Sequence, residues 1–252
     1  MELTFEEFGT GDALLLIHGL GGTGNVWGPQ ATLLARYFRV IVPDLRGAGR
    51  TVGPGEISVA TLVGDVLELL DHLDVKLAHV LGHSFGSVIA QHLTVQHPKR
   101  VRSLGLIGPI RAPSEMSVKA LRDRAALARK EGLVGIANTT VQAGTSAATK
   151  ATRPEVVAFV RELVMRQDPA RYADTCEAIA AVQPAALETI TCPTLVVTGD
   201  EDATSPPAAA KAIADAIPGS RYVILPRCGH WIPLEQAADL TNALMNFLFQ
   251  RA

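Results

Sequence analysis

The chain has 252 residues, of which 48% are hydrophobic, and a formal net charge of −2. This length and composition predict a globular protein with one large core, or one core and a small lid, and exclude a disordered chain. The small net charge argues against a nucleic-acid partner, and no apolar run is long enough to cross a bilayer, so we expect no membrane partner.

The three cysteines, Cys176, Cys192 and Cys228, are far apart in the chain and odd in number. They form neither a disulfide framework nor the spacing of metal ligands, so the sequence predicts no metal site. The first seven residues are acidic where a secretory signal would be basic and then apolar. These features favour a cytoplasmic location.

The first part of the chain alternates apolar runs typical of strands with stretches of helical periodicity. We expect strands over 3–8, 13–17, 40–42, 78–81 and 101–107. Residues 59–73 carry apolar side chains at helical spacing after a candidate N-cap, Ser58, and a further helix follows residue 86. Uninterrupted apolar strands separated by helices predict a mostly parallel sheet that is covered on both faces.

The middle of the chain changes character, because residues 110–190 are rich in Ala, Arg and Glu and show no strand pattern. Here we expect helices over 117–130, 154–165 and 169–182. Strands return at 194–198 and 222–225, and helices at 208–217 and 235–249. The sequence therefore predicts an α/β core of residues 1–110 and 188–252, with a helical cap, residues 111–187, inserted between strands.

The most informative motif is Gly82-His83-Ser84-Phe85-Gly86, which lies between an expected strand and an expected helix. A strand that enters a helix through G-x-S-x-G is typical of the nucleophile elbow, a tight turn that exposes a strained serine. Gly82 and Gly86 provide the small residues that such a reversal needs. Ser84 is therefore the candidate nucleophile.

A serine hydroxyl needs a base, and histidine is the usual one because its pKa lies near neutrality. Of the seven histidines, His230 alone lies in a glycine-led loop, Cys228-Gly229-His230, directly after the last expected strand. A loop at that strand end can bring the imidazole over the elbow. His230 is thus the candidate base.

The base needs a carboxylate that orients it, and Gly199-Asp200-Glu201-Asp202 follows the strand at 194–198. The order Ser, Asp, His along the chain is that of α/β-hydrolases. We favour Asp202, because the third residue after the glycine turns back toward the sheet in loops of this kind, and Asp200 is the alternative. The loop after the strand at 101–107 offers no acid.

An oxyanion hole needs two convergent backbone donors. One is expected from the residue after the nucleophile, Phe85. The other is expected from the loop His18-Gly19-Leu20-Gly21-Gly22 after an early strand, with Leu20 as the donor. A phosphate-binding loop is the alternative, but the spacing and lysine of a Walker A motif are absent.

Five motifs in this order resemble the α/β-hydrolase superfamily over nearly the whole chain: residues 18–21, 43–49, 82–86, 199–202 and 229–230. Two positions depart from the family pattern. Ala48 stands where the D-x-R-G-x-G turn often has histidine, and Ser87 stands where a second glycine is frequent. Both lie outside the candidate triad.

Within the superfamily, the short core and helical cap resemble the branch of 3-oxoadipate enol-lactonases and small carboxylesterases. The resemblance implies a cofactor-free serine hydrolase that acts on a small-molecule ester or lactone through Ser84, Asp202 and His230. Haloalkane dehalogenases and epoxide hydrolases differ, because they carry aspartate at the position of Ser84. Carbon–carbon bond hydrolases, thioesterases, perhydrolases and hydroxynitrile lyases use the same triad and stay open, as does a ligand-binding receptor on this scaffold.

The expected cap is also basic. Residues 111–171 contain eleven Lys or Arg and six Asp or Glu, a formal charge of +5, and the remainder of the chain has −7. We therefore expect the cap to cover the pocket and to favour an anionic acyl group. The simpler interpretation is that these cations are solvated on helix surfaces.

Overall fold

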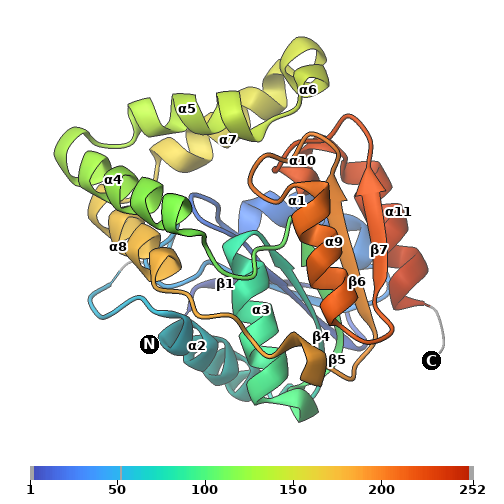
Figure 1. The fold of residues 1–252 in the computed structure, drawn as a ribbon. Coiled ribbons are helices and arrows are strands. Elements are labelled where there is room, and N and C mark those ends of the chain that lie inside the picture. Colours follow the sequence, from blue (N-terminus) through green and yellow to red (C-terminus); the bar gives the residue numbers. More distant parts are fainter. Residues whose placement is uncertain (1–2, 52, 250–252) are drawn as a thin grey trace.

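The computed structural model describes residues 3–51 and 53–249, and its centre is a sheet of seven strands (Figure 1). The strands are β1 (Phe5–Phe8), β2 (Ala13–Ile17), β3 (Arg39–Pro43), β4 (Ala78–His83), β5 (Val101–Ile107), β6 (Thr194–Gly199) and β7 (Arg221–Leu225). Their order across the sheet is β1-β3-β2-β4-β5-β6-β7, and only β1 is antiparallel to its neighbour. The predicted mostly parallel sheet is confirmed.

Helices cover both faces of the sheet. Successive side chains of each strand point to opposite faces, and because both sets are apolar, both faces need cover. Leu15 and Ile17 of β2 belong to a core that includes α2 (Val59–His72), α3 (Phe85–Gln96) and α9 (Pro207–Ala216). Leu14 and Leu16 belong to a second core, with α1 (Gly28–Leu34) and α11 (Ala237–Leu248). Burial on both faces is the physical reason for the uninterrupted apolar strands.

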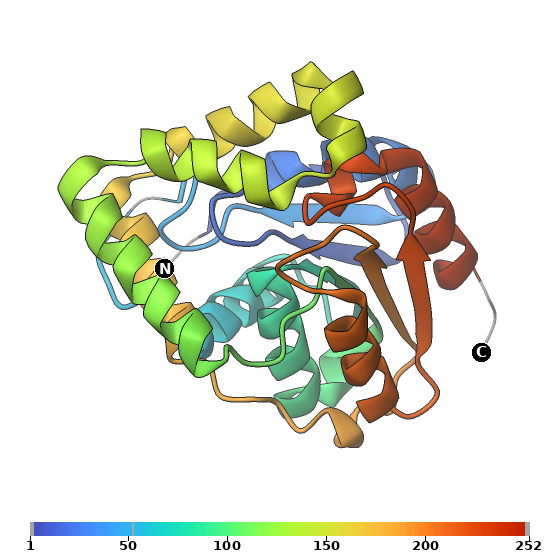
Figure 2. The same ribbon diagram turned by 45° about the horizontal axis from the view of Figure 1, so that its top comes forward.

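Five further helices lie between β5 and β6 in the chain and form a layer of their own over the sheet (Figures 1 and 2). They are α4 (Glu115–Glu131), α5 (Val134–Gly144), α6 (Ala147–Thr152), α7 (Pro154–Met165) and α8 (Pro169–Ala180). The layer has its own apolar cluster, in which Val160 and Ala173 pack with Trp231 from the loop after β7. The prediction of helices inserted between strands is thus confirmed.

Local predictions hold where the signal is a cap or a proline. Ser58 is the N-cap of α2 and forms a capping box with Thr61, while Pro154 and Pro169 begin α7 and α8. The remaining short elements are 3-10 turns, Gly24–Trp27, Pro98–Arg100 and Leu187–Thr189.

The main difference from the predicted elements lies at α5 and α6, for which the sequence predicts no helix. Thr and Gly, which are weak helix formers, are frequent there, but Ile136, Ala137 and Val141 of α5 are buried in the cap cluster. Tertiary packing therefore overrides propensity. The expected helix at 235–249 is present as α11, which begins at Ala237, and Gln236 separates it from the short preceding helix α10 (Ile232–Glu235).

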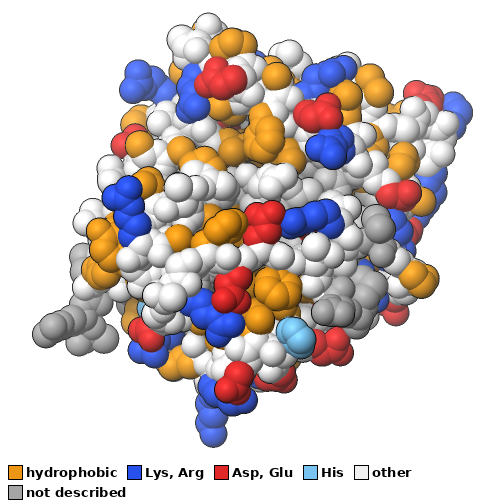
Figure 3. Space-filling model, turned by 180° about the vertical axis from the view of Figure 1, so that it is seen from behind, with side chains coloured by type: hydrophobic (Ala, Val, Ile, Leu, Met, Phe, Trp, Pro, Cys, Tyr) orange, Lys and Arg blue, Asp and Glu red, His pale blue; other side chains and the backbone are white. Residues whose placement is uncertain are grey.

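The face of the molecule opposite to the view of Figure 1 offers few clues to a partner. Seen from behind, basic and acidic side chains lie interspersed, and neither sign forms a continuous field (Figure 3). None of the helices in the described ranges is both long and apolar enough to span a lipid bilayer.

Candidate active site

Ser84 forms the turn between β4 and α3 and has φ 55° and ψ −120°, a conformation that non-glycine residues rarely adopt. Such strain costs about 1–3 kcal/mol and persists only where the surroundings impose it. Here the Ser84 N–H donates to the Ile107 carbonyl at 2.9 Å, and the Ser84 carbonyl accepts from the Ser87 hydroxyl at 2.6 Å. Ser87 thus holds the turn at a position where the superfamily that the sequence resembles often has glycine.

The two glycines of the elbow are required because no side chain fits at either position. A Cβ on Gly82 would lie 2.3 Å from the Gly86 carbonyl oxygen, and a Cβ on Gly86 would lie 2.4 Å from that of Ile17. Both contacts are with backbone, which cannot move aside without displacing the strands. The sharp reversal predicted from the motif is therefore confirmed.

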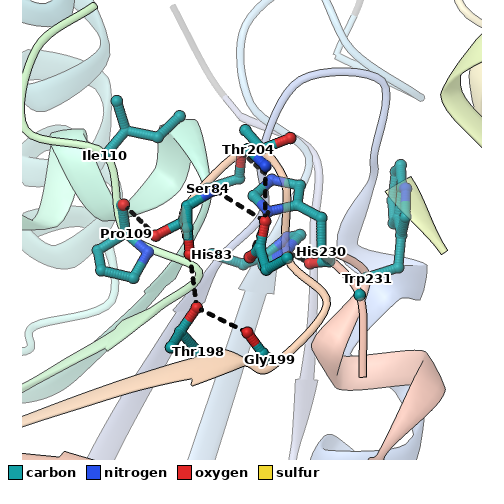
Figure 4. Close-up of polar contacts among 12 residues, drawn as sticks. His83, Ser84, Pro109, Ile110, Thr198, Gly199, Thr204, His230 and Trp231 are labelled. Carbon is teal, nitrogen blue, oxygen red and sulfur yellow. Dashed lines mark hydrogen bonds and ion pairs between the residues drawn. The ribbon is translucent and has the colours of Figure 1, made fainter. Parts of the chain in front are cut away.

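The side chains of Ser84, His230 and Asp202 form one continuous hydrogen-bonded chain. Figure 4 shows Ser84 and His230 side by side at the turn. His230 Nε2 lies 2.8 Å from Ser84 Oγ, and His230 Nδ1 lies 2.9 Å from Asp202 Oδ2. Because a carboxylate only accepts, Nδ1 carries the proton and Nε2 is free to accept from the serine hydroxyl. The structure therefore brings together three residues that are separated by up to 146 positions in the sequence.

Asp202 is the carboxylate that faces His230, and Asp200 is not. Asp202 Oδ1 accepts from the N–H groups of Thr204 at 2.9 Å and Ser205 at 2.8 Å. Burial alone would raise the pKa of Asp202, but the His230 partner and these two donors hold its pKa below the ordinary value. Asp200 is exposed, and its carboxylate accepts from the Cys228 N–H at 3.0 Å.

Two residues that sequence reasoning does not single out fix the backbone around His230. Glu235 is buried, and its carboxylate accepts from Ser146 N at 2.7 Å, Gly229 N at 3.2 Å and Trp231 N at 3.1 Å. It therefore ties both neighbours of His230 to the cap. The only signal in the sequence is an isolated acid five residues after His230 in the otherwise uncharged run 231–236.

His83, next to the nucleophile, donates from Nε2 to the His230 carbonyl oxygen at 2.7 Å. Burial, with a smaller contribution from the nearby His230, lowers the pKa of His83 to about 3. His83 is therefore neutral at physiological pH and acts as a fixed donor. Its ring also meets Trp27 edge-on, with centroids 6.4 Å apart.

The two residues expected to supply the oxyanion donors, Leu20 and Phe85, line one small pocket beside the elbow. A Cβ on Gly19 would lie 2.7 Å from Ser84 Cβ and 3.3 Å from Phe85 N, so the glycine allows the loop to approach the elbow closely. Leu20 follows and lines the same pocket as Ser84. In the described ranges, neither the Leu20 nor the Phe85 N–H donates to a turn or side-chain acceptor.

The turn at residues 44–49 supports this loop. The Leu45 N–H donates to His18 Nε2 at 2.9 Å, so His18 Nδ1 carries the proton that is donated to the Gly19 carbonyl. Asp44 accepts from the Gly24 N–H at 2.8 Å and pairs with Arg50. Because these contacts are structural, alanine at position 48 leaves the turn intact, and Ala48 itself pairs with Thr51.

A pocket of about 440 Å³ opens beside Ser84 and His230. Its walls come from the loops after β4, β5, β6 and β7 and from α4, α5 and α8 of the cap, and most are apolar or carry hydroxyl groups. Within residues 3–51 and 53–249, no group of three His, Cys, Asp or Glu side chains is arranged to hold a metal ion. The arrangement can activate a serine hydroxyl beside a cavity that fits a small molecule.

Comparison with known proteins agrees with the fold and with this geometry. The family described as alpha/beta hydrolase fold matches residues 12–237. The chain belongs to this family. An esterase structure from Thermogutta terrifontis, with malate bound, is 33% identical with a TM-score of 0.94, and the match covers 98% of this chain and 92% of the esterase.

Two further relatives indicate the range of activities. The enol-lactonase structure from Burkholderia xenovorans is 30% identical with a TM-score of 0.93, and the match covers 98% of this chain and 96% of the enol-lactonase. The 2-hydroxy-6-oxo-6-(2'-aminophenyl)hexa-2,4-dienoic acid hydrolase of Metapseudomonas resinovorans is 28% identical, and the match covers 100% of this chain and 89% of that hydrolase. The predicted α/β-hydrolase with a likeness to esterases and enol-lactonases is confirmed, and the protein is a hydrolase.

Proposed function

We propose that the protein is a serine hydrolase that cleaves a small carboxylic ester or lactone through an acyl-enzyme on Ser84. The observation that carries this proposal is the chain of hydrogen bonds from Asp202 through His230 to Ser84, with distances of 2.9 and 2.8 Å. Such an arrangement gives the hydroxyl a base within hydrogen-bond reach and gives the base a fixed tautomer.

In the first half of the reaction, Ser84 Oγ attacks the acyl carbon while His230 Nε2 takes the hydroxyl proton. The negative charge that develops on the carbonyl oxygen is held by the N–H groups of Leu20 and Phe85. Asp202 stabilises the imidazolium that forms. His230 then gives its proton to the departing alkoxide oxygen, which leaves Ser84 esterified.

In the second half, His230 takes a proton from a water molecule as the water oxygen attacks the acyl carbon. The tetrahedral intermediate collapses, the Ser84 oxygen recovers the proton from His230, and the carboxylic acid departs. Esters and lactones both suit this sequence, because each has an alkoxide leaving group that needs one proton.

The pocket supports a small substrate, because about 440 Å³ holds a molecule of modest size. Residues 111–187 serve in this proposal as the cap that covers the pocket, with Ser117, Leu121 and Tyr172 among its lining residues. A covered, largely apolar pocket strengthens the electrostatic contacts of the oxyanion. We infer that the cap selects the substrate while the core carries out the reaction.

The proposal is tested with 4-nitrophenyl butyrate as a small ester, with wild type, Ser84→Ala and Ser220→Ala. Ser220 is a matched control, because its hydroxyl donates to the Ala214 carbonyl. We expect Ser84→Ala to lose about 10⁴-fold or more in kcat, since the nucleophile is gone, and Ser220→Ala to match wild type. Retention of a tenth of the wild-type rate by a folded Ser84→Ala variant would overturn the mechanism.

A further inference from the structure

The cap owes its positive charge to many cations, but most of them are neutralised on its surface. Arg129 pairs with Asp174 and Glu177, which lie on α8. Further ion pairs join Lys119 to Asp123, Lys130 to Glu131, Arg153 to Glu155, Arg166 to Glu162 and Arg171 to Asp174. The overall basicity of the cap is therefore no guide to the substrate, and the informative cation is the one that reaches the pocket.

That cation is Arg124 on α4. Ser117, Leu121 and Arg124 recur at helical spacing on one face of this helix, and all three line the pocket that contains Ser84 and His230. Among the described lining residues, Arg124 is the one Lys or Arg, and none is Asp or Glu. The pocket thus contains a fixed positive charge without an acidic counterpart.

Arg124 is half-buried, and in the described ranges its guanidinium forms no ion pair with a carboxylate. Its neighbours are the Tyr172 phenol and the Cys176 thiol, both buried. Burial raises the pKa of each to about 12, and the positive charge of Arg124 opposes both rises. Both neighbours are therefore neutral at physiological pH, and neither compensates the charge of Arg124.

A guanidinium in such a place favours an anionic ligand. It presents several N–H donors in a planar fork that matches a carboxylate, and charge-assisted bonds gain strength away from bulk water. The remaining walls include Leu121, Ile179 and Trp231, which suit the carbon skeleton of a ligand.

We propose that Arg124 binds a carboxylate group of the substrate, so that the protein acts on esters or lactones that carry a second, free carboxylate. This inference rests on the proposed hydrolysis at Ser84. It assigns substrate selection to one side chain of the cap and not to the net charge of the cap.

The test compares esters that differ in one charge. The acyl chains of 4-nitrophenyl butyrate and 4-nitrophenyl hemisuccinate have equal carbon number, and the second ends in a carboxylate. A third ester, 4-carboxyphenyl butyrate, places the carboxylate on the leaving group and is compared with phenyl butyrate. The readout is the ratio of kcat/KM for the charged ester to that for its neutral partner.

We expect wild type to favour the charged ester in one of the two pairs. In that pair, Arg124→Gln should lower the ratio of kcat/KM values by about 10- to 100-fold, which corresponds to the loss of one hydrogen bond to a charged group. Arg124→Lys keeps the charge but loses the planar fork, so it restores part of the ratio. Arg122→Gln is the matched control, because Arg122 is exposed on the same helix and does not line the pocket.

Failure of this inference is distinguishable from failure of the proposed function. If all esters are hydrolysed in a Ser84-dependent way and Arg124→Gln leaves both ratios at the wild-type value, Arg124 does not bind the carboxylate and the inference is wrong. The same holds if wild type prefers the neutral ester in both pairs. If hydrolysis does not depend on Ser84, the proposed function and this inference both fail. Circular dichroism and thermal unfolding of each variant show that it is folded.

Discussion

Replacement of Asp202 by asparagine tests the catalytic geometry, because the surroundings dictate how the new amide must lie. Asp202 Oδ1 accepts from Thr204 N at 2.9 Å and Ser205 N at 2.8 Å, so the amide oxygen of Asn has to stay at this position. The amide NH₂ then replaces Oδ2, which lies 2.9 Å from His230 Nδ1. His230 Nδ1 also lies 3.0 Å from Oδ1, which already accepts from two backbone N–H groups. The NH₂ can only donate, and a protonated Nδ1 would face it at 2.9 Å, so the variant favours the tautomer in which Nδ1 is an acceptor.

This change moves the imidazole proton to Nε2, which points at Ser84 Oγ from 2.8 Å. A protonated Nε2 cannot take the serine proton. An Asp-to-Asn change of this kind in a catalytic triad lowers kcat by about 10⁴-fold, or about 5.5 kcal/mol of transition-state stabilisation. The fold should persist, because Asn keeps the two bonds to Thr204 and Ser205.

The assay is steady-state hydrolysis of 4-nitrophenyl butyrate at pH 7.5 by wild type, Asp202→Asn and Asp200→Asn (the pH is chosen to be about one unit above the ordinary histidine pKa). The Asp200 variant is the matched control. The amide oxygen of Asn can still accept from Cys228 N at this exposed position, so we expect the kcat of the Asp200 variant to stay within about threefold of wild type. A folded Asp202→Asn variant with a tenth of the wild-type kcat, or an equal loss in both variants, would refute the reasoning.

Two further predictions concern stability. Burial lowers the pKa of His79 to about 4 in the folded state, below its value of about 6.5 when unfolded, so stability present above pH 6.5 is lost as pH falls toward 4. The free energy of unfolding is measured by urea denaturation at pH 7 and at pH 5. The decrease between these two pH values should be about 2 kcal/mol smaller for His79→Asn than for wild type. An equal decrease in both proteins would contradict this prediction. Glu235→Gln should lose about 1–3 kcal/mol, because one amide cannot accept from Ser146 N, Gly229 N and Trp231 N together. Glu235→Gln should also lower kcat, because the loop that carries His230 loses one of its anchors. A wild-type free energy of unfolding together with a wild-type kcat would contradict the role of Glu235 in positioning His230.

The features that the sequence predicts well are those with a local cause. A strand buried on both faces is largely apolar, so β2 is visible as an uninterrupted run of apolar residues. The elbow needs glycine at positions 82 and 86 because a Cβ at either would meet backbone at less than 2.5 Å. The order of the nucleophile, acid and base follows from which strand each residue terminates.

The features that the sequence does not reveal depend on contacts between distant segments. Glu235 joins the His230 loop to Ser146, which is 89 residues away in the chain. Arg124 cannot be distinguished in the sequence from the other cations of the cap, because only the packing of α4 against α8 turns its face toward the pocket. Helix α5 is likewise stabilised by burial in the cap cluster rather than by propensity, whereas α6 begins at an N-cap, Ser146, whose hydroxyl accepts from Thr149 N.

The central claim, that Ser84 is a nucleophile activated by His230, is tested most directly by covalent trapping. Wild type and Ser84→Ala are incubated with a fluorophosphonate, and the intact mass and the modified peptide are determined by mass spectrometry. We predict one phosphonyl group on Ser84 in the wild type and none in Ser84→Ala, with His230→Ala labelled far more slowly. An unmodified wild type, or equal labelling of Ser84→Ala, would contradict the claim.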